Sequence, residues 1–412
     1  MSDCPDNTPL GNSISVLSGF PFPSAQFTEG IGKPLIRIRD LIGSRTETNF
    51  VGDFDPAFLI RHDDVLIGMD GDFNVVRWKG PEALLNQRVC KVSSASDEID
   101  ERFLFWWLKP HIQIVHRRTP QTTVRHLSVG DVYRIPKPTL VSKAQAFAAV
   151  VLDTVDEAIA KTEAVIAKLR QVRAGLLHDL LTRGLDQNGQ LRDSIANPEQ
   201  FQDSPLGRIP KEWTVRSCQS LCREIVVGIV VKPAQYYVED GVPVLRSANI
   251  REGGIQLSDL VFISPASNMQ LSKSMLRTDD VVTVRTGYPG TTCVVPSHLD
   301  GANCVDLIIS RPGKEIVPKF LALWVNSSFG KDQVLRVQGG LAQQHFNVGE
   351  MKTLLVARPE PDEQKAIVER LEALDSQIAV TTGEQAKLSL LKSGLMTDLL
   401  TGRVRVPEAI GT

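Results

Sequence analysis

The chain of 412 residues is longer than one hydrophobic core usually serves, so two or three domains are expected. A hydrophobic content of 42% with 23% charged residues is typical of a globular chain and argues against intrinsic disorder. The formal net charge of −2 excludes a polycation, so nucleic-acid binding would need local basic clusters or partners that share the charge.

Two strand-rich segments, each followed by one long helix, are predicted along the chain. Alternating runs at residues 35–39 and 281–285 are typical of strands, and the first run places Arg37 and Arg39 on one face. The predicted fold class is therefore α+β. In chain order the expected parts are a first mixed domain (1–140), a first long helix (141–184), a polar linker (185–205), a second mixed domain (206–361) and a second long helix with a tail (362–412).

The second half of the chain repeats the first at a constant offset. Asp179-Leu180-Leu181-Thr182 returns 219 residues later as Asp398-Leu399-Leu400-Thr401. Both helices carry apolar residues at alternating three- and four-residue steps, the heptad pattern of a coiled coil, and Arg173 matches Lys392 among the polar interruptions. The predicted seam comprises Leu152, Val155, Ile159, Ile166, Leu169, Leu176 and Leu180, with Leu371, Leu374, Ile378, Leu388, Leu395 and Leu399.

This duplication predicts two similar halves related by a pseudo-twofold axis, with the long helices packed against each other. Helices packed on two unrelated cores are the alternative. Twofold-related halves suit a target with two half-sites, and B-form DNA is the commonest such target. The loops differ more than the helices, because residues 70–74 read Asp-Gly-Asp-Phe-Asn where residues 286–290 read Thr-Gly-Tyr-Pro-Gly. Different loops on one scaffold predict an asymmetric bipartite site.

Signals for catalysis are poor. The sequence contains no Walker A motif, no adenine-methyltransferase signature and no glycine-rich dinucleotide loop. The pairs at residues 63–64 and 279–280 are candidate metal-binding aspartates, but each pair precedes a predicted strand, which favours a structural role. The six cysteines and seven histidines do not cluster at metal-ligand spacing, so no cofactor or metal is expected in this chain.

The expected location is the cytoplasm. No apolar run reaches the roughly 18 residues that span a bilayer. The first residues lack the basic and apolar regions of a signal peptide, and the cysteines do not form a disulfide framework.

Basic and amide side chains recur at matching places in both halves. Arg and Gln read guanine and adenine edges in the major groove, while Lys, Thr and backbone amides hold phosphates. For each cluster taken alone, a solvated surface is the alternative. The expected DNA contacts are Arg37, Arg39, Asn74, Arg117, Arg118, Arg125, Arg246, Asn249, Arg285, Tyr288, Arg336, Gln343 and Gln344.

Several short motifs accompany the two long helices along the chain. They are Ser18-Gly19-Phe20-Pro21-Phe22, the run from Pro34 to Leu41, Ile135-Pro136-Lys137-Pro138, the run from Gly207 to Trp213 and the run from Arg358 to Gln364. In their order and duplication these parts resemble the specificity subunit of type I restriction-modification systems, and the resemblance covers essentially the whole chain. The stretch Thr139 to Gln145 departs from the family pattern, because it lacks the acidic Pro-x-x-Glu-Gln form seen before the second helix.

The resemblance implies a non-catalytic DNA-specificity subunit with two target recognition domains, separated by an antiparallel two-helix coiled coil. Its implied partners are double-stranded DNA, two modification subunits that bind S-adenosylmethionine and methylate adenine, and restriction subunits that use ATP and Mg. A nuclease that uses the paired aspartates and a coiled-coil scaffold without a DNA role are the alternative functions.

Overall fold

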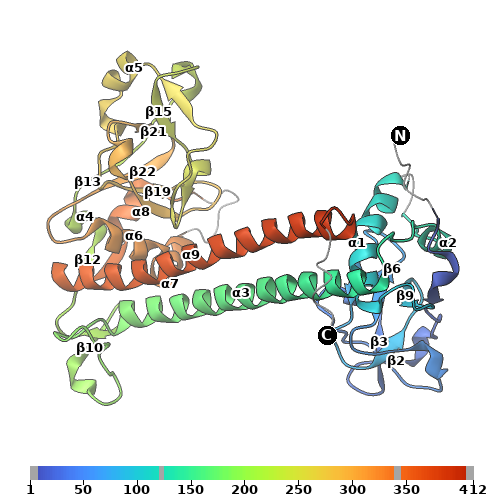
Figure 1. The fold of residues 1–412 in the computed structure, drawn as a ribbon. Coiled ribbons are helices and arrows are strands. Elements are labelled where there is room, and N and C mark those ends of the chain that lie inside the picture. The colour runs from blue at the N-terminus through green and yellow to red at the C-terminus, as the bar shows by residue number, and fades with distance from the viewer. Residues whose placement is uncertain (1–7, 120–124, 338–344, 405–412) are drawn as a thin grey trace. The chain divides into compact units, whose positions relative to one another are not determined.

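The computed structural model of the chain describes residues 8–119, 125–337 and 345–404. The chain forms two compact units: unit 1 contains residues 1–164 and 382–412, and unit 2 contains residues 165–381. The boundaries fall inside the long helices α3 (Ser142–Thr182) and α9 (Pro361–Leu400), so each unit includes part of both helices (Figure 1). Among the described residues, no helix has both the length and the apolar composition to cross a membrane.

The described residues of unit 1 form two sheets and two shorter helices. The first sheet is antiparallel throughout, with the order β1 (Ile14–Ser18), β9 (Val89–Ser94), β6 (Val65–Gly68) and β7 (Val75–Arg77). The second sheet has the order β2 (Phe27–Thr28), β4 (Asn49–Phe50), β3 (Lys33–Ile36), β8 (Ala83–Leu85) and β5 (Leu59–Ile60), with β3 and β8 parallel. Helices α1 (Glu101–Arg118) and α2 (Val129–Tyr133) follow along the chain.

The central strand β6 is buried on both faces. Val65 and Ile67 belong to a hydrophobic cluster with Phe103 of α1, while Leu66 belongs to a second cluster with Trp78. A strand covered on both sides requires a continuous apolar run instead of alternation, and β6 has one. The first sheet of unit 1 therefore has a helix on one face and a second hydrophobic cluster on the other.

Unit 2 repeats this strand order, except that among its described residues the second sheet has no strand equivalent to β5. Its first sheet has the order β13 (Cys222–Val227), β22 (Leu307–Pro312), β19 (Val281–Val284) and β20 (Thr292–Val294), again antiparallel throughout. Its second sheet has the order β14 (Tyr237–Val238), β18 (Val261–Ile263), β15 (Val242–Leu245) and β21 (Asn303–Cys304), and β15 and β21 are parallel as β3 and β8 are. Val281 and Val282 of β19 face different clusters, as the residues of β6 do.

Short elements complete unit 2. The helices are α4 (Cys218–Leu221), α5 (Pro265–Gln270), α6 (Pro318–Asn326), α7 (Ser328–Val337) and α8 (Val348–Thr353). The two-stranded pairs are β10 (Phe201–Ser204) with β11 (Gly207–Pro210), β12 (Thr214–Ser217) with β23 (Leu355–Arg358), and β16 (Ile250–Arg251) with β17 (Gly254–Ile255).

Two sequence predictions need correction. The strand predicted over residues 35–39 is wrong beyond Ile36, because the Asp40 carboxylate accepts the backbone N–H of Arg37 at 2.8 Å and turns the chain into a 3-10 helix. The stretch 185–205 is not a free linker. Its Leu185 is buried, and its Arg192 donates a 2.7 Å hydrogen bond to a carboxylate of α9, so the stretch is a packed part of unit 2.

The predicted seam positions of the long helices all face inward. Each one is buried or half-buried, whereas most other positions of α3 and α9 are exposed. Leu152 and Leu399 belong to the main core of unit 1, and Leu180 and Leu371 to the main core of unit 2. The heptad pattern therefore identified the buried face of both helices in both units.

Side-chain pairs between α3 and α9 follow one antiparallel register. In every pair the two residue numbers add up to 548, as an antiparallel alignment requires. Opposite charges meet in two of the pairs, and a Gln amide meets a carboxylate in the third. The pairs are Asp156 with Lys392 and Glu163 with Gln385 in unit 1, and Arg173 with Asp375 in unit 2.

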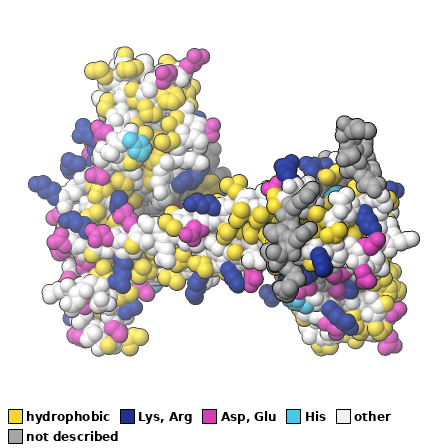
Figure 2. All heavy atoms as spheres, in the orientation of Figure 1, with side chains coloured by type: hydrophobic (Ala, Val, Ile, Leu, Met, Phe, Trp, Pro, Cys, Tyr) yellow, Lys and Arg dark blue, Asp and Glu magenta, His cyan; other side chains and the backbone are white. Residues whose placement is uncertain are grey.

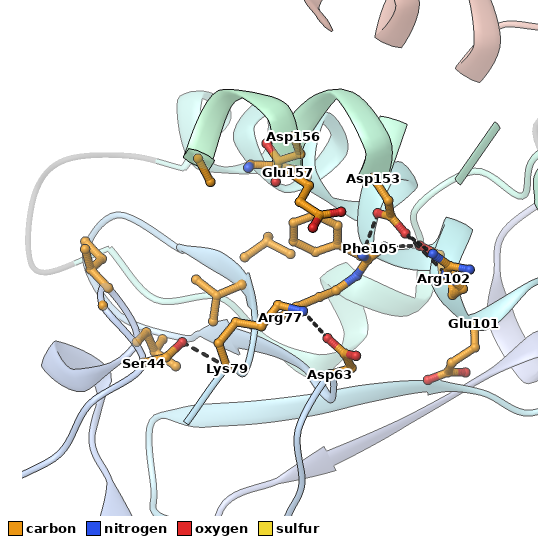
Figure 3. Close-up of a pocket in the computed structure, with 17 residues that line it drawn as sticks. Ser44, Asp63, Arg77, Lys79, Glu101, Arg102, Phe105, Asp153, Asp156 and Glu157 are labelled. Atoms are coloured by element: carbon orange, nitrogen blue, oxygen red, sulfur yellow. Dashed lines mark hydrogen bonds and ion pairs between the residues drawn. The ribbon is translucent and has the colours of Figure 1, made fainter. Parts of the chain in front are cut away.

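Asp153 connects α3 to the sheet and to α1 within unit 1. Its carboxylate accepts hydrogen bonds from Arg77 Nη1 at 2.5 Å, Arg102 Nη2 at 2.8 Å and Trp106 Nε1 at 2.8 Å. Figure 3 shows Arg77 and Arg102 converging on this carboxylate at the wall of a cavity of about 790 Å³. The Asp153 side chain is only 16% exposed, so these charge-assisted bonds form in a poorly solvated place.

Replacing Asp153 with Asn is expected to lower the free energy of unfolding of unit 1 by about 1–3 kcal/mol, because two guanidinium groups lose their anionic acceptor. Hydrogen exchange read by mass spectrometry measures the effect unit by unit. Peptides from β7 and α1 should lose protection, and peptides from unit 2 should keep it. The exposed Glu157 lies one turn away on α3, so Glu157→Gln is the matched control. Unchanged protection in D153N would refute this role of Asp153.

Candidate DNA-recognition surfaces

A glycine turn, a helix end and one returning segment meet in unit 1. The turn spans residues 70–74, and the N–H of Gly71 donates to the backbone oxygen of Arg125 at 3.0 Å. The ring of Phe73 meets the edge of His116 near the end of α1, with 5.2 Å between the ring centroids. We call this set, with residues 116–118, 125 and 126, the unit 1 turn surface.

Basic side chains gather on the unit 1 turn surface. Arg117 and Arg118 are exposed in the last turn of α1, where the helix dipole favours positive charge. Arg125 lies 2.8 Å from a ring nitrogen of His116, and His126 lies 2.7 Å from a carboxylate oxygen of Asp70. The positive charge is local, since Figure 2 shows Lys and Arg interspersed with Asp and Glu over the visible face of each unit.

Unit 2 brings together the same three parts. Its turn spans residues 286–290, and the Cβ position of Gly290 would lie 3.2 Å from Val334 of α7. The N–H of Phe346, in the returning segment, donates to the backbone oxygen of Arg285 at 3.0 Å. In unit 1 the hydrogen bond between Gly71 and Arg125 likewise joins the turn to the returning segment. We call this set, with residues 334–336 and 346, the unit 2 turn surface.

The unit 2 turn surface exposes different side chains. Tyr288 is 84% exposed at the tip of the turn, and Arg336 is exposed near the end of α7. Arg285 is mostly buried, because its Nη1 donates to Asp306 at 2.5 Å. An exposed aromatic ring and an exposed guanidinium group are suited to stacking on bases and to binding phosphates.

Equivalent turns of the two units carry an ion pair of opposite polarity. In unit 1 the acid, Asp70, lies on the glycine turn, and the base, Arg88, lies just before β9 at a distance of 3.4 Å. In unit 2 the base, Arg285, lies before the glycine turn, and the acid, Asp306, lies just before β22. Arg88 and Asp306 both have positive φ, of 70° and 52°. The two surfaces therefore share a backbone arrangement and differ in charge.

The other sequence-predicted contacts lie in turns after β3 and β15. Asn249 is 1% exposed, its side-chain oxygen accepts the N–H of Arg246, and its amide nitrogen donates to two backbone oxygens. The prediction that Asn249 contacts DNA is therefore wrong, because its side-chain amide is already bonded within the turn and has no free group for a base. Arg246 donates to a backbone oxygen at 2.5 Å, and Arg37 binds the hydroxyl of Thr48. Arg39 is exposed.

One of the remaining predicted contacts lies on the unit 1 turn surface, and two lie outside the described residues. Asn74 is half-buried at the end of the unit 1 turn, where its backbone oxygen accepts the N–H of Gly68 at 3.0 Å. Gln343 and Gln344 lie outside the described residues.

The paired aspartates have the same structural role in both units. The Asp64 carboxylate accepts the N–H of Arg61 at 2.7 Å, and the Asp280 carboxylate accepts the N–H of Arg277 at 2.9 Å. Burial raises the pKa of Asp280, although the nearby Arg311 opposes this. Across the described parts of the chain, no three His, Cys, Asp or Glu side chains are grouped as metal ligands. These contacts favour turn formation over metal-dependent nuclease chemistry.

A buried glutamine near the start of each long helix escaped the sequence analysis. Gln145 of α3 and Gln364 of α9 are 1% and 0% exposed, and they stand 219 residues apart, as the other repeated residues do. The signal was in the sequence, because both halves keep Gln at this position.

Comparison with known proteins identifies the family. A family model described as the type I restriction modification DNA specificity domain matches residues 290–390. The type I restriction enzyme EcoBI specificity subunit of Escherichia coli is 30% identical over 377 residues, which cover 89% of this chain and 78% of the relative. The MjaVIII specificity subunit of Methanocaldococcus jannaschii is 23% identical over 377 residues, which cover 90% of this chain and 84% of the relative.

Solved structures share the fold. The S subunit of a type I restriction-modification system from M. genitalium matches 97% of this chain and 98% of its own length, with a TM-score of 0.60 at 15% identity. A second chain, from a structural study of the assembly of a type I system, matches 97% of this chain and all of its own length, with a TM-score of 0.52 at 17% identity. These matches support a mixed helix and strand fold over the full chain.

The chain therefore belongs to the specificity subunits of type I restriction-modification systems. It is the DNA-specificity component of such a system and is not itself the enzyme.

Proposed function

We propose that the chain recognises an asymmetric bipartite DNA site, with one half-site read by each unit. The observation that carries this proposal is the repeated scaffold with unlike turn surfaces. The first sheets of the two units have matching strand orders, while the ion pair at the glycine turn has opposite polarity in the two units and the exposed Tyr288 lies on the unit 2 turn alone. Two target recognition domains built in this way would bind two different base sequences.

The proposed DNA contacts are the exposed residues of the two turn surfaces. Arg117 and Arg118 would bind phosphates in unit 1. In unit 2, Arg336 and Tyr288 would bind phosphates or stack on bases. Asn74, Arg125 and Arg285 border these residues. Gln343 and Gln344 remain proposed contacts by their place in the sequence, and Arg39 remains one by its exposure. Arg37 and Arg246 would assist by holding their turns.

The long helices are proposed to form an antiparallel coiled-coil spacer within a pseudo-twofold duplication. The shared register supports this proposal. The helix ion pairs also correspond under the repeat, since adding 219 to Asp156 gives Asp375 and adding 219 to Arg173 gives Lys392. The spacer would set the number of unread base pairs between the half-sites.

The chemistry is proposed to belong to partner subunits. Two modification subunits would bind S-adenosylmethionine and methylate adenine, and restriction subunits would use ATP and Mg to cleave DNA. Sharing phosphate contacts with such partners would compensate for the small net charge of −2. The proposed setting is the cytoplasm, where these partners and the DNA would meet.

Single-molecule sequencing of methylated adenine tests the proposal. A host that lacks type I methylation is supplied with the modification subunit, with or without this chain. We expect one new methylated motif that has two unlike half-sites and a fixed gap, and we expect it only with this chain. A palindromic motif would contradict the assignment of unlike domains, and the absence of any motif would refute the proposed function.

Replacing Arg117 and Arg118 with Ala is expected to weaken DNA binding by the complex at all sequences. The slope of the logarithm of the binding constant against the logarithm of salt concentration should fall by about 1 for each lost phosphate contact. Binding of fluorescent duplexes over a series of salt concentrations measures this slope. Lys161→Ala, on the exposed face of α3, is the control and should keep the wild-type slope. An unchanged slope in the double variant would exclude these arginines from the phosphate contacts.

Inserting seven residues after Ala164 together with seven after Gly383 is expected to lengthen the gap by about 3 base pairs, because seven helical residues add about 10 Å. These places face each other in the observed register, so the pairing on both sides is kept. The same insertions after Ala174 and Ser393, which do not face each other, are the control and should abolish methylation. A methylated motif with its original gap in the first variant would rule out the spacer role.

A further inference from the structure

The buried glutamines Gln145 and Gln364 make the same three hydrogen bonds in their respective units. The Gln145 side-chain oxygen accepts the N–H of Asp100 at 3.0 Å, and its nitrogen donates to the backbone oxygens of Glu98 at 2.9 Å and Leu140 at 2.8 Å. The side-chain amide thus links three segments: the start of α3, the chain just before that helix, and the chain before α1.

Gln364 repeats this arrangement in unit 2. Its oxygen accepts the N–H of Val317 at 2.7 Å, and its nitrogen donates to the backbone oxygens of Glu315 at 2.9 Å and Pro359 at 2.8 Å. The surrounding sequences differ, with Val-Ser-Lys-Ala before Gln145 and Pro-Asp-Glu before Gln364. The glutamine and its bonds are therefore shared where most of the neighbouring side chains are not.

One partner of each glutamine is the N-cap residue of a shorter helix in the same unit. Asp100 is the N-cap of α1, and Val317 is the N-cap of α6. Helix α1 carries Arg117 and Arg118 of the unit 1 turn surface at its other end, and α6 leads directly into α7, which carries Arg336. Each glutamine thus ties the first turn of a long helix to the helix that leads to a turn surface in the same unit.

We propose that Gln145 and Gln364 are positioning residues that fix each turn surface to its long helix and thereby restrict the gap between half-sites. This inference rests on the proposed function. Adding one base pair to the gap moves a half-site by about 3.4 Å and turns it by about 35° around the duplex. A specificity subunit can discriminate between such neighbouring gaps only if the joint between recognition domain and spacer is rigid. A fully buried amide with all its bonds satisfied provides this rigidity.

Gln145→Met and Gln364→Met remove the three bonds and keep a side chain of similar size. We expect the methylated half-sites to keep their base sequences in these variants. The methylated fraction at sites whose gap differs by one base pair should rise about tenfold, because the unpaired backbone groups no longer hold the domain in one orientation. The measurement is the gap distribution of methylated adenines in a host that expresses the complete complex.

Matched controls and a milder variant separate positioning from simple loss of stability. Gln171→Met and Gln377→Met change exposed glutamines of the same two helices and should keep the wild-type gap. Gln145→Asn and Gln364→Asn keep a neutral amide but shorten the side chain by one methylene, so some of the three bonds are lost and an intermediate relaxation of the gap is expected.

Failure of this inference is distinct from failure of the proposed function. Wild-type chain that directs no bipartite methylation refutes the function. A wild-type motif of one gap, with the same single gap in the Met variants, refutes the positioning role even if total methylation falls. If the Met variants yield no methylation, the Asn variants decide: a strict wild-type gap in them also overturns the inference.

Discussion

Each unit completes its hydrophobic core with helix segments from both halves of the chain, and this constraint governs the rest of the structure. The core of unit 1 includes Leu152 of α3 together with Leu399 of α9, which lies 247 residues later in the sequence. The core of unit 2 includes Leu180 of α3 and Leu371 of α9. Burial of these leucines is worth about 1.5–3 kcal/mol each. Neither repeat can bury its apolar surface alone, so folding requires the two long helices to pair.

The two turn surfaces carry different side chains on a shared backbone arrangement. The backbone turns before β9 and β22 have the same left-handed residue, but Arg88 occupies one and Asp306 the other. Each finds a partner of opposite charge beside the adjacent glycine turn, so the ion pair survives while its polarity is reversed. The charge at this left-handed position therefore differs between the units, while each unit keeps a partner of opposite charge at or next to its glycine turn.

Much of this architecture could be predicted because it depends on periodicity, and periodicity is visible in one sequence. The heptad steps predicted the buried faces of α3 and α9, and the offset of 219 predicted which positions correspond. What failed depended on side-chain hydrogen bonds that have no period. Asp40 ends β3 early, because its carboxylate accepts the N–H of Arg37. Asn249 is unavailable to DNA, because its side chain forms hydrogen bonds within its own turn. The role of Gln145 could not be predicted from spacing, because one of its acceptors, the backbone oxygen of Glu98, lies 47 residues upstream in the sequence. The other acceptor, the backbone oxygen of Leu140, lies only five residues away.

Charged side chains on the seam and beside it specify the direction of helix pairing. If the helices were parallel and aligned by the repeat, Arg173 would face Lys392 and Asp156 would face Asp375, so both pairs would repel. The antiparallel register at a residue sum of 548 exchanges the partners, so Lys392 meets Asp156 and Arg173 meets Asp375. An apolar seam alone would permit both directions, because the leucines repeat at the same spacing either way. The charged positions therefore destabilise the wrong alignment in addition to stabilising the observed one.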